Sequence, residues 1–424
     1  MLVKVIHTLG SRVLIAVLNL VLLVLTTNLM GAESRGQISL FILNLSLATL
    51  ISGFAGGPSL VYLAPRVKTV SILLINTIWT LVSVPSLVIL LYQLGLITTT
   101  STAVFLGIAI IESFLATNLM LLLGKEQVHR HNLLQVIKVI IPVAGLVAVN
   151  FYLPITFETF VWFYAFSIII TFILSLFYLI RDTNIKSFSP GLVETVKLAF
   201  NFGIINQLGN VAQLMNYRLS YYLLELLISP PQLAFVRIGI FSASMQISES
   251  LWHFTRSVNT VQHATVSNIT DRHAALMLSI KLLKLNYLVT GAGILVIWMI
   301  PNDFFIWTLG DEFIDVKSHF LLLAPGIFAL AFSGAINHFF AGIGDLKYNT
   351  RTSIFGFLLA ILLYYPSIKL FETEGAAICT SIVYLFQAVW QFKQLKNSDH
   401  VMLNDLTIKS GDISWLKSKF SRGS

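Results

Sequence analysis

The stretch from Lys197 to Ser229 reads KLAFNFGIINQLGNVAQLMNYRLSYYLLELLIS, and it is long and apolar enough to cross a bilayer. Polar side chains nevertheless occur along its whole length. An α-helix turns by about 100° per residue, so many of them fall in one stripe, with Arg218 and Glu225 on its shoulder. A guanidinium at membrane depth costs about 3 kcal/mol or more unless it faces a cavity or a partner. One side of this helix is therefore predicted to face water, through Asn206, Asn210, Gln213, Tyr217, Ser220 and Tyr221.

A dry polar seam between helices is the alternative, with Arg218 and Glu225 neutralising each other. These two residues are separated by roughly 10 Å along the helix axis, which makes direct pairing within the helix awkward. The sequence leaves both interpretations open.

The composition indicates a polytopic membrane protein. The chain has 424 residues, of which 56% are hydrophobic and 11% charged, and its mean hydropathy is +0.83. Its formal charge of +8 is not gathered into a basic stripe with interleaved aromatic residues, so we expect no nucleic-acid partner. The single cysteine, Cys379, permits no internal disulfide, and the first apolar run is too long for a cleavable signal peptide.

Apolar segments of spanning length predict an all-α membrane protein with twelve transmembrane helices in two six-helix lobes. The N-terminal lobe is predicted over 1–190, the C-terminal lobe over 191–397, and an amphipathic cytoplasmic tail over 398–424. The predicted spans are 12–31, 37–63, 70–92, 102–123, 132–152, 159–180, 198–228, 233–256, 281–301, 318–343, 351–370 and 375–393.

Most of the 27 lysines and arginines fall at the ends that are cytoplasmic when both termini are cytoplasmic, which supports that orientation. The opposite loops are short. The longest, from Asn302 to Lys317, is too small for a folded catalytic domain. Nucleotide-binding, metal-binding and nucleophile motifs are missing from the sequence. We therefore expect a protein that is not an enzyme and needs no cofactor.

Other ionisable residues lie within or beside the spans. Glu112 has apolar residues on its own helix face and is either a protonated packing residue or a proton carrier. Glu249 shares a face with Gln246 on a polar track toward the cytoplasmic end. Arg12 begins the first span, where it can reach lipid headgroups or a cavity, and Arg237 is expected to extend toward the interface.

Two further features concern backbone geometry. Gly36-Gln37-Ile38-Ser39 and Gly239-Ile240-Phe241-Ser242 stand at matching places in the two halves, either by chance or because of an internal repeat. Gly56-Gly57-Pro58 predicts a bend that lines a path.

The polar residues suit a ligand with an anionic head and a sugar-like body. Arginine binds phosphate through its fork of donors, whereas amide and tyrosine side chains bind hydroxylated rings. Drug-like cations require an acidic, aromatic cavity instead. The sign of the central charge therefore distinguishes the two substrate classes.

Five short segments resemble signatures of the bacterial polysaccharide flippases, which belong to the multidrug/oligosaccharidyl-lipid/polysaccharide exporter superfamily. Met30–Gly36 (MGAESRG) is similar to the family's LGxExxG turn, and Asn216–Leu219 is similar to its NYRLD motif. Leu309–Phe313, Pro325–Gly326 and Gly375–Ile378 resemble the LGxxF, PG and GAA signatures. The order of the segments matches the family over nearly the whole chain.

This resemblance implies a two-lobed bundle that alternates between inward-open and outward-open states in the cytoplasmic (inner) membrane of a bacterium. The implied cargo is an undecaprenyl-diphosphate-linked oligosaccharide, moved to the outer leaflet for O-antigen or capsule assembly. H⁺ or Na⁺ would drive it, and membrane lipids, a polysaccharide polymerase and a chain-length regulator would be partners. Ser220 stands where the family often has Asp, so Glu225, Glu249 or Glu112 would have to couple the ion.

We therefore expect Arg218 to bind the diphosphate or an acidic sugar, and Asn210, Gln213 and Tyr217 to contact sugar. Asn206, Gln246 and Arg12 complete the expected cavity. The alternatives are a cation-coupled multidrug extruder and an integral-membrane glycan polymerase or ligase, and the short outer loops argue against the second.

Overall fold

The computed structural model describes residues 2–53, 69–97, 100–181 and 192–407, and all regular structure in these ranges is helical. Side chains at 2–9, 192–206, 253–254, 257, 264 and 346 are outside this description. The all-α prediction is thus confirmed for the described part of the chain. The predicted bend at Gly56-Gly57-Pro58 and the predicted tail from 408 onward lie outside it.

The N-terminal half contains five described helices. The first, α1 (Leu2–Ser52), covers the first predicted span and the described part of the second, and Gly31 interrupts it with φ 75°. That backbone conformation favours glycine, which explains why the chain turns there. The other helices are α3 (Thr69–Gln93), α4 (Thr102–Gly124), α5 (Val128–Val149) and α6 (Phe157–Arg181).

The C-terminal half begins with two long helices, α7 (Leu192–Leu227) and α8 (Pro231–Val266), followed by α9 (Arg272–Met299). Within the predicted loop 302–317, α10 (Asn302–Leu309) and the 3₁₀ turn η1 (Asp311–Phe313) form instead. Gly310, at φ 105°, ends α10, as glycine does after many helices. The half continues with α11 (Val316–Gly342), α12 (Leu346–Asp399), which is kinked at Glu372, and α13 (Leu403–Leu406).

Eight described helices or helical stretches are long and apolar enough to cross a membrane, which supports a multi-pass membrane protein. Two of them, 10–52 in α1 and 347–399 in α12, are about twice the length that one crossing requires, and each contains a kink. α7 and α8 are not among the eight. The twelve-span count and the orientation of the termini remain predictions.

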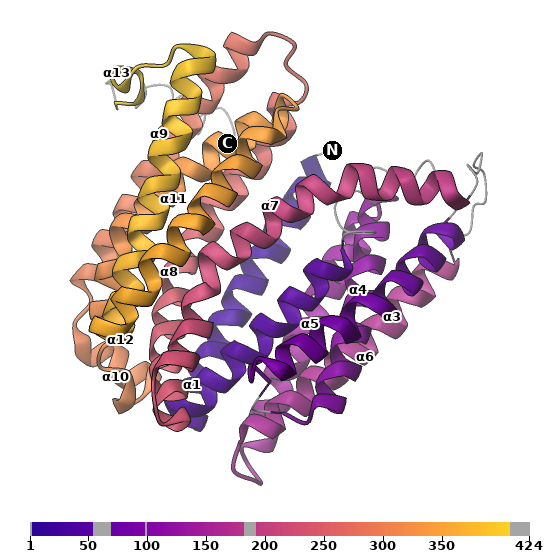
Figure 1. The fold of residues 1–424 in the computed structure, drawn as a ribbon, viewed down its shortest axis with the longest axis vertical. Coiled ribbons are helices and arrows are strands. Elements are labelled where there is room, and N and C mark those ends of the chain that lie inside the picture. Colours follow the sequence, from indigo (N-terminus) through magenta and orange to yellow (C-terminus); the bar gives the residue numbers. More distant parts are fainter. Residues whose placement is uncertain (1, 54–68, 98–99, 182–191, 408–424) are drawn as a thin grey trace.

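The helices form two bundles that diverge toward one end of the molecule (Figure 1). α3 to α6 pack together with α1 in one bundle, whereas α8, α9, α11 and α12 form the other. α7 packs mainly against α12, and α1 packs extensively along α8. The backbones of α1 and α8 approach closely at Gly36, shortly after the Gly31 kink.

Two glycines allow this close meeting. A Cβ atom on Gly36 would lie 1.9 Å from the carbonyl oxygen of Phe235, and one on Gly239 would lie 1.9 Å from that of Ala32. Only glycine lets two helix backbones approach so closely. The two segments that resemble each other in sequence therefore pack against each other.

Hydrogen bonds extend this contact, which we call the seal. Ser39 Oγ donates to Ser242 Oγ over 2.8 Å, and Ala32 N donates to Glu312 Oε2 over 2.5 Å. The seal is thus formed by small residues and polar groups from 32–39, 235–242 and 312.

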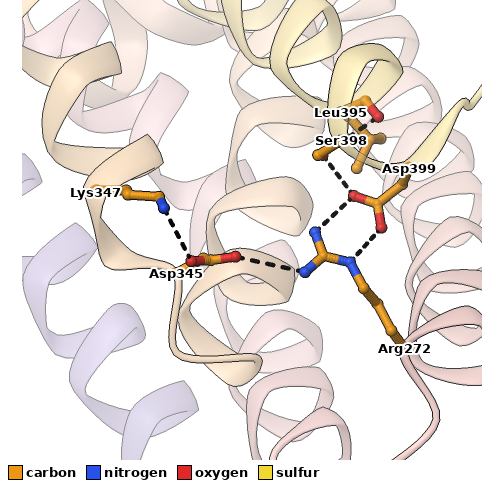
Figure 2. A network of polar contacts seen from close by, with 6 residues as sticks. All are labelled: Arg272, Asp345, Lys347, Leu395, Ser398 and Asp399. Atoms are coloured by element: carbon orange, nitrogen blue, oxygen red, sulfur yellow. Dashed lines mark hydrogen bonds and ion pairs between the residues drawn. The ribbon is translucent and has the colours of Figure 1, made fainter.

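At the opposite end, a polar network joins three points of the C-terminal half (Figure 2). Arg272, at the start of α9, donates to both carboxylate oxygens of Asp399 at the end of α12, over 2.5 and 3.0 Å. It also reaches Asp345 before α12, over 3.5 Å. Arg237 forms an ion pair over 2.9 Å with Glu372 at the α12 kink, between two predicted spans, and its extension toward the interface remains a prediction.

Candidate functional site

A cavity of about 700 Å³ lies between the two halves of the chain. Its walls come from α1, α5 and α6 in the N-terminal half and from α7 and α8 in the C-terminal half. Arg35, Ser39 and Ser242 line it next to the seal, so the seal closes one end of the cavity. The other lining residues lead away from the seal along α8 to Arg256.

Positive charge predominates on the lining. Among the described residues, four basic side chains and one carboxylate face the cavity: Arg35, Lys138, Arg218, Arg256 and Glu249. A water-filled space with this balance attracts anions and disfavours cations.

Arg218, the residue singled out first in the sequence, forms an ion pair across the cavity wall. Its Nη2 donates to Glu249 Oε1 of α8 over 2.5 Å, and its Nη1 donates to the Tyr221 hydroxyl over 2.8 Å. Arg218 therefore pairs with Glu249, and not with Glu225 as the alternative interpretation of the sequence suggested. Glu225 is not among the lining residues, because it lies two turns further along α7.

The rest of the α7 stripe divides in two. Asn210, Gln213 and Tyr217 line the cavity, whereas Ser220 is fully buried away from it. Gln213 Oε1 also accepts from Ser353 Oγ over 2.8 Å, so α12 fixes its amide. The side chain of Asn206 is outside the described part of the structure.

Aromatic rings flank this polar wall. The ring of Tyr217 makes edge contacts with Trp252 and Tyr384, at centroid distances of 5.2 and 5.6 Å. The Arg256 guanidinium lies 5.1 Å from the Trp252 ring. Flat rings beside amide groups are suited to contacting sugars.

The structure corrects the interpretation of Glu112 as a carboxyl group surrounded by apolar residues, because a charged residue lies beside it. Glu112 forms an ion pair with Lys138 of α5, whose ammonium group also lies 5.9 Å from the ring of Tyr164. The partner comes from a different helix, so the face of α4 could not reveal it. Lys138 and Tyr164 line the cavity, and Glu112 is connected to it only through Lys138.

The observed cavity lining includes Arg35, which was not predicted to line it, and lacks Arg12, which was predicted to line it. Arg12 is not a lining residue: it is exposed and donates to Thr260 Oγ1 over 2.9 Å. Arg35, which falls in a predicted outer loop, lines the cavity and is 8% exposed. Gln246 lines the cavity as expected and accepts from Arg35 Nη2 over 2.5 Å.

The fold is similar to solved transporter structures. An inward-facing multidrug resistance MATE family transporter of the MOP superfamily matches with a TM-score of 0.69 and 15% identity, over 93% of this chain and 99% of the other. An outward-facing multidrug resistance MATE family transporter of the MOP superfamily matches with a TM-score of 0.64 and 15% identity, over 93% of this chain and 97% of the other.

A third neighbour is a MOP superfamily transporter from Pyrococcus furiosus, described as having a binding pocket of reverse polarity that suggests a different function. Its TM-score is 0.65 at 15% identity, over 92% of this chain and 94% of the other. No protein-family model and no curated protein sequence matches this chain.

The structural neighbours are thus MATE family transporters of the MOP superfamily, and at this identity the likeness concerns the fold alone. An inward-facing and an outward-facing transporter structure both share this fold.

Proposed function

We propose that this protein is a flippase for undecaprenyl-diphosphate-linked oligosaccharides. It moves the repeat unit from the cytoplasmic to the outer leaflet of a bacterial inner membrane, for O-antigen or capsular polysaccharide assembly. Twelve spans in two six-helix lobes, with cytoplasmic termini, would alternate around the central cavity. The polyprenyl tail stays in lipid while the diphosphate and sugars pass through.

The observation that carries this proposal is the sign of the cavity charge. Four basic side chains and one carboxylate face the cavity. Arg218 pairs with that carboxylate and Lys138 pairs with Glu112 behind the wall, which leaves the charges of Arg35 and Arg256 in excess. A diphosphate satisfies such a surface through charge-assisted hydrogen bonds to the guanidinium fork. Asn210, Gln213 and Tyr217 are then the sugar-contacting residues, beside Trp252.

A proton or sodium gradient supplies the energy in this proposal. Glu249 is the best-placed coupling carboxylate, because it lines the cavity and holds Arg218. Glu112 can take part only through Lys138, and Glu225 lies off the lining. A polysaccharide polymerase and a chain-length regulator are proposed as partners.

The second candidate is a cation-coupled multidrug extruder, which the similarity to two multidrug resistance transporters favours. A cavity that is net positive disfavours cationic drugs. The Pyrococcus furiosus neighbour, with its pocket of reverse polarity, indicates that the sign of the pocket varies on this fold. The two candidates therefore differ in a measurable substrate charge.

The test is a deletion strain of the native host complemented with the wild type, Arg218→Ala or Arg272→Gln. A flippase restores surface polysaccharide, Arg218→Ala does not, and Arg272→Gln does, because Arg272 lies off the cavity lining at the end opposite the seal. Ethidium resistance should be the same in all strains. Ethidium resistance that follows the gene, with unchanged surface polysaccharide, would establish the extruder instead.

Purified protein gives an independent measurement. In liposomes, a fluorescent polyprenyl-diphosphate oligosaccharide becomes accessible to a membrane-impermeant quencher only after flipping. The wild type should increase this rate, and Arg218→Ala should lower it toward that of protein-free liposomes. Equal rates for the wild type and Arg218→Ala would remove Arg218 from the proposed site.

A further inference from the structure

Arg35 is a buried cation whose hydrogen-bond partners are neutral. Its Nη2 donates to Gln246 Oε1 over 2.5 Å and its Nη1 donates to Thr26 Oγ1 over 3.3 Å. Its Nε is buried and has no hydrogen-bond partner. The side chain is 8% exposed and lines the cavity.

A buried guanidinium is costly unless a negative charge compensates it. Glu249 is close enough to Arg35 to interact electrostatically, but its ion pair is with Arg218. Among the described residues, no ion pair includes Arg35. The deep end of the cavity therefore carries one positive charge more than its carboxylate neutralises, and it has a free donor.

The same arginine is part of the contact between the two halves. It precedes Gly36, whose backbone touches that of Phe235, and it lies one turn before Ser39, which bonds to Ser242. Its acceptor, Gln246, belongs to α8 and donates in turn to the carbonyl oxygen of Asn19 in α1, over 2.7 Å. The Arg35–Gln246 hydrogen bond thus joins the cavity to the seal.

We propose that Arg35 couples occupation of the cavity to opening of the seal. A phosphate group that enters the deep end takes the Arg35 guanidinium from Gln246, because an anionic oxygen is a stronger acceptor than an amide oxygen. The contact between α1 and α8 then loses a hydrogen bond beside the seal. This inference rests on the proposed function only for the identity of the anion, the diphosphate of the cargo.

The energetic requirement is that the anion binds more tightly when the seal is open. A ligand shifts a conformational equilibrium only by its differential affinity for the two states. Arg35 provides this difference in affinity. It donates a hydrogen bond to Gln246 when the seal is closed and can donate to the phosphate instead when the seal is open. Loss of a hydrogen bond to a charged group shifts the equilibrium by about tenfold or more.

Disulfide formation across the seal tests the proposal. Cys379 is the only native cysteine, so the parent for this assay is Cys379→Ser with Ser39→Cys and Ser242→Cys. The rate of disulfide formation with diamide is measured with and without inorganic pyrophosphate, in the full-length protein. Pyrophosphate should slow the reaction about tenfold in this parent and leave it unchanged after Arg35→Gln.

Two further variants make the result specific. Gln246→Leu removes the acceptor, so it should slow disulfide formation without pyrophosphate and abolish the further effect of pyrophosphate. Because it leaves Arg35 in place, it tests the coupling even if Arg35→Gln fails to fold. Arg272→Gln also removes an arginine charge, but at the end of the molecule opposite the seal and off the cavity lining, and it should respond like the parent.

Calorimetric titration of pyrophosphate separates this inference from the proposed function. If pyrophosphate binds the parent but does not alter disulfide formation, or if Arg35→Gln responds like the parent, the coupling role of Arg35 is overturned and the anionic substrate stands. If the parent binds no pyrophosphate at millimolar concentration, both proposals fail.

Discussion

The substitution Gly36→Ala should prevent the seal from closing. The added Cβ atom would lie 1.9 Å from the carbonyl oxygen of Phe235 and 3.0 Å from its Cα atom. These are backbone atoms of α8, so no side-chain rotation relieves the overlap. α1 and α8 would have to separate locally by roughly 1.5 Å to restore ordinary contact.

The magnitude follows from the contacts that are lost. Overpacking in a tight contact costs about 1–3 kcal/mol. Separation by this amount also breaks the 2.8 Å hydrogen bond between Ser39 and Ser242, worth about 1 kcal/mol. A total of about 2–4 kcal/mol lowers the ratio of sealed to open molecules by about thirtyfold or more.

Spin labels at two exposed positions can measure this ratio. Tyr152, in the loop between α5 and α6, is 85% exposed, and Trp307, in α10, is 78% exposed. With both replaced by labelled cysteines in a Cys379→Ser background, electron–electron distances report the separation of the halves. Gly36→Ala should move most of the distribution to longer distances and abolish transport.

Gly107→Ala is the matched control. Gly107 is also in a helix, α4, but nothing lies within 4 Å of its added Cβ atom. Alanine is favoured over glycine within a helix by about 0.5–1 kcal/mol, so this variant should fold and transport like the parent. If Gly36→Ala gives the same distance distribution as Gly107→Ala, the close backbone contact does not control the seal.

Three further predictions concern the charged residues. Lys138→Ala leaves Glu112 buried without its cation and should lower the free energy of unfolding by about 3 kcal/mol in thermal or chemical unfolding. Lys138→Met with Glu112→Leu should recover most of this loss, and failure to recover would contradict the pairing argument. Glu249→Gln frees Arg218 from its carboxylate and should tighten pyrophosphate binding about tenfold by calorimetry, whereas an unchanged affinity would refute competition between them. Arg272→Gln should lower the free energy of unfolding by about 1 kcal/mol at low salt and by less at high salt, because salt screens the ion pairs of Arg272. Equal losses at both salt concentrations would rule out an electrostatic origin.

The helix positions could be predicted where apolar runs end at charged or turn residues. α4 was expected over 102–123 and spans Thr102–Gly124, and α6 was expected over 159–180 and spans Phe157–Arg181. α8 was expected to end at 256 but continues to Val266, because its last turns are polar yet still helical. Hydropathy detects the part of a helix that lies in lipid, not the helix itself.

The site was harder to predict because its contacts join different helices. The spacing of polar residues along α7 predicted that Arg218 and most of the polar residues of this helix line the cavity. It could not predict the ion pair of Arg218 with Glu249, because Glu249 lies on α8. Lys138 falls inside the predicted span 132–152 and Arg35 in the predicted loop between the first two spans, and neither position alone indicates a shared cavity. The kink at Gly31 instead directs the start of the second half of α1 into the cavity wall, and only the neighbouring Gly36 repeat indicated a special contact there.

The second half of α1 explains how the seal can break while each half stays intact. Toward its own half, Phe41 makes edge contacts with Phe105, Phe157 and Tyr164, at centroid distances of 5.8 to 6.1 Å. Toward α8, the same helix presents Gly36 and a serine hydroxyl. In lipid, association depends on packing and hydrogen bonds. The aromatic side is held by rings packed against each other, whereas the seal includes hydrogen bonds that a competing ligand can replace. Movement between the halves should therefore separate α1 from α8 at Gly36 before it disturbs the packing around Phe41.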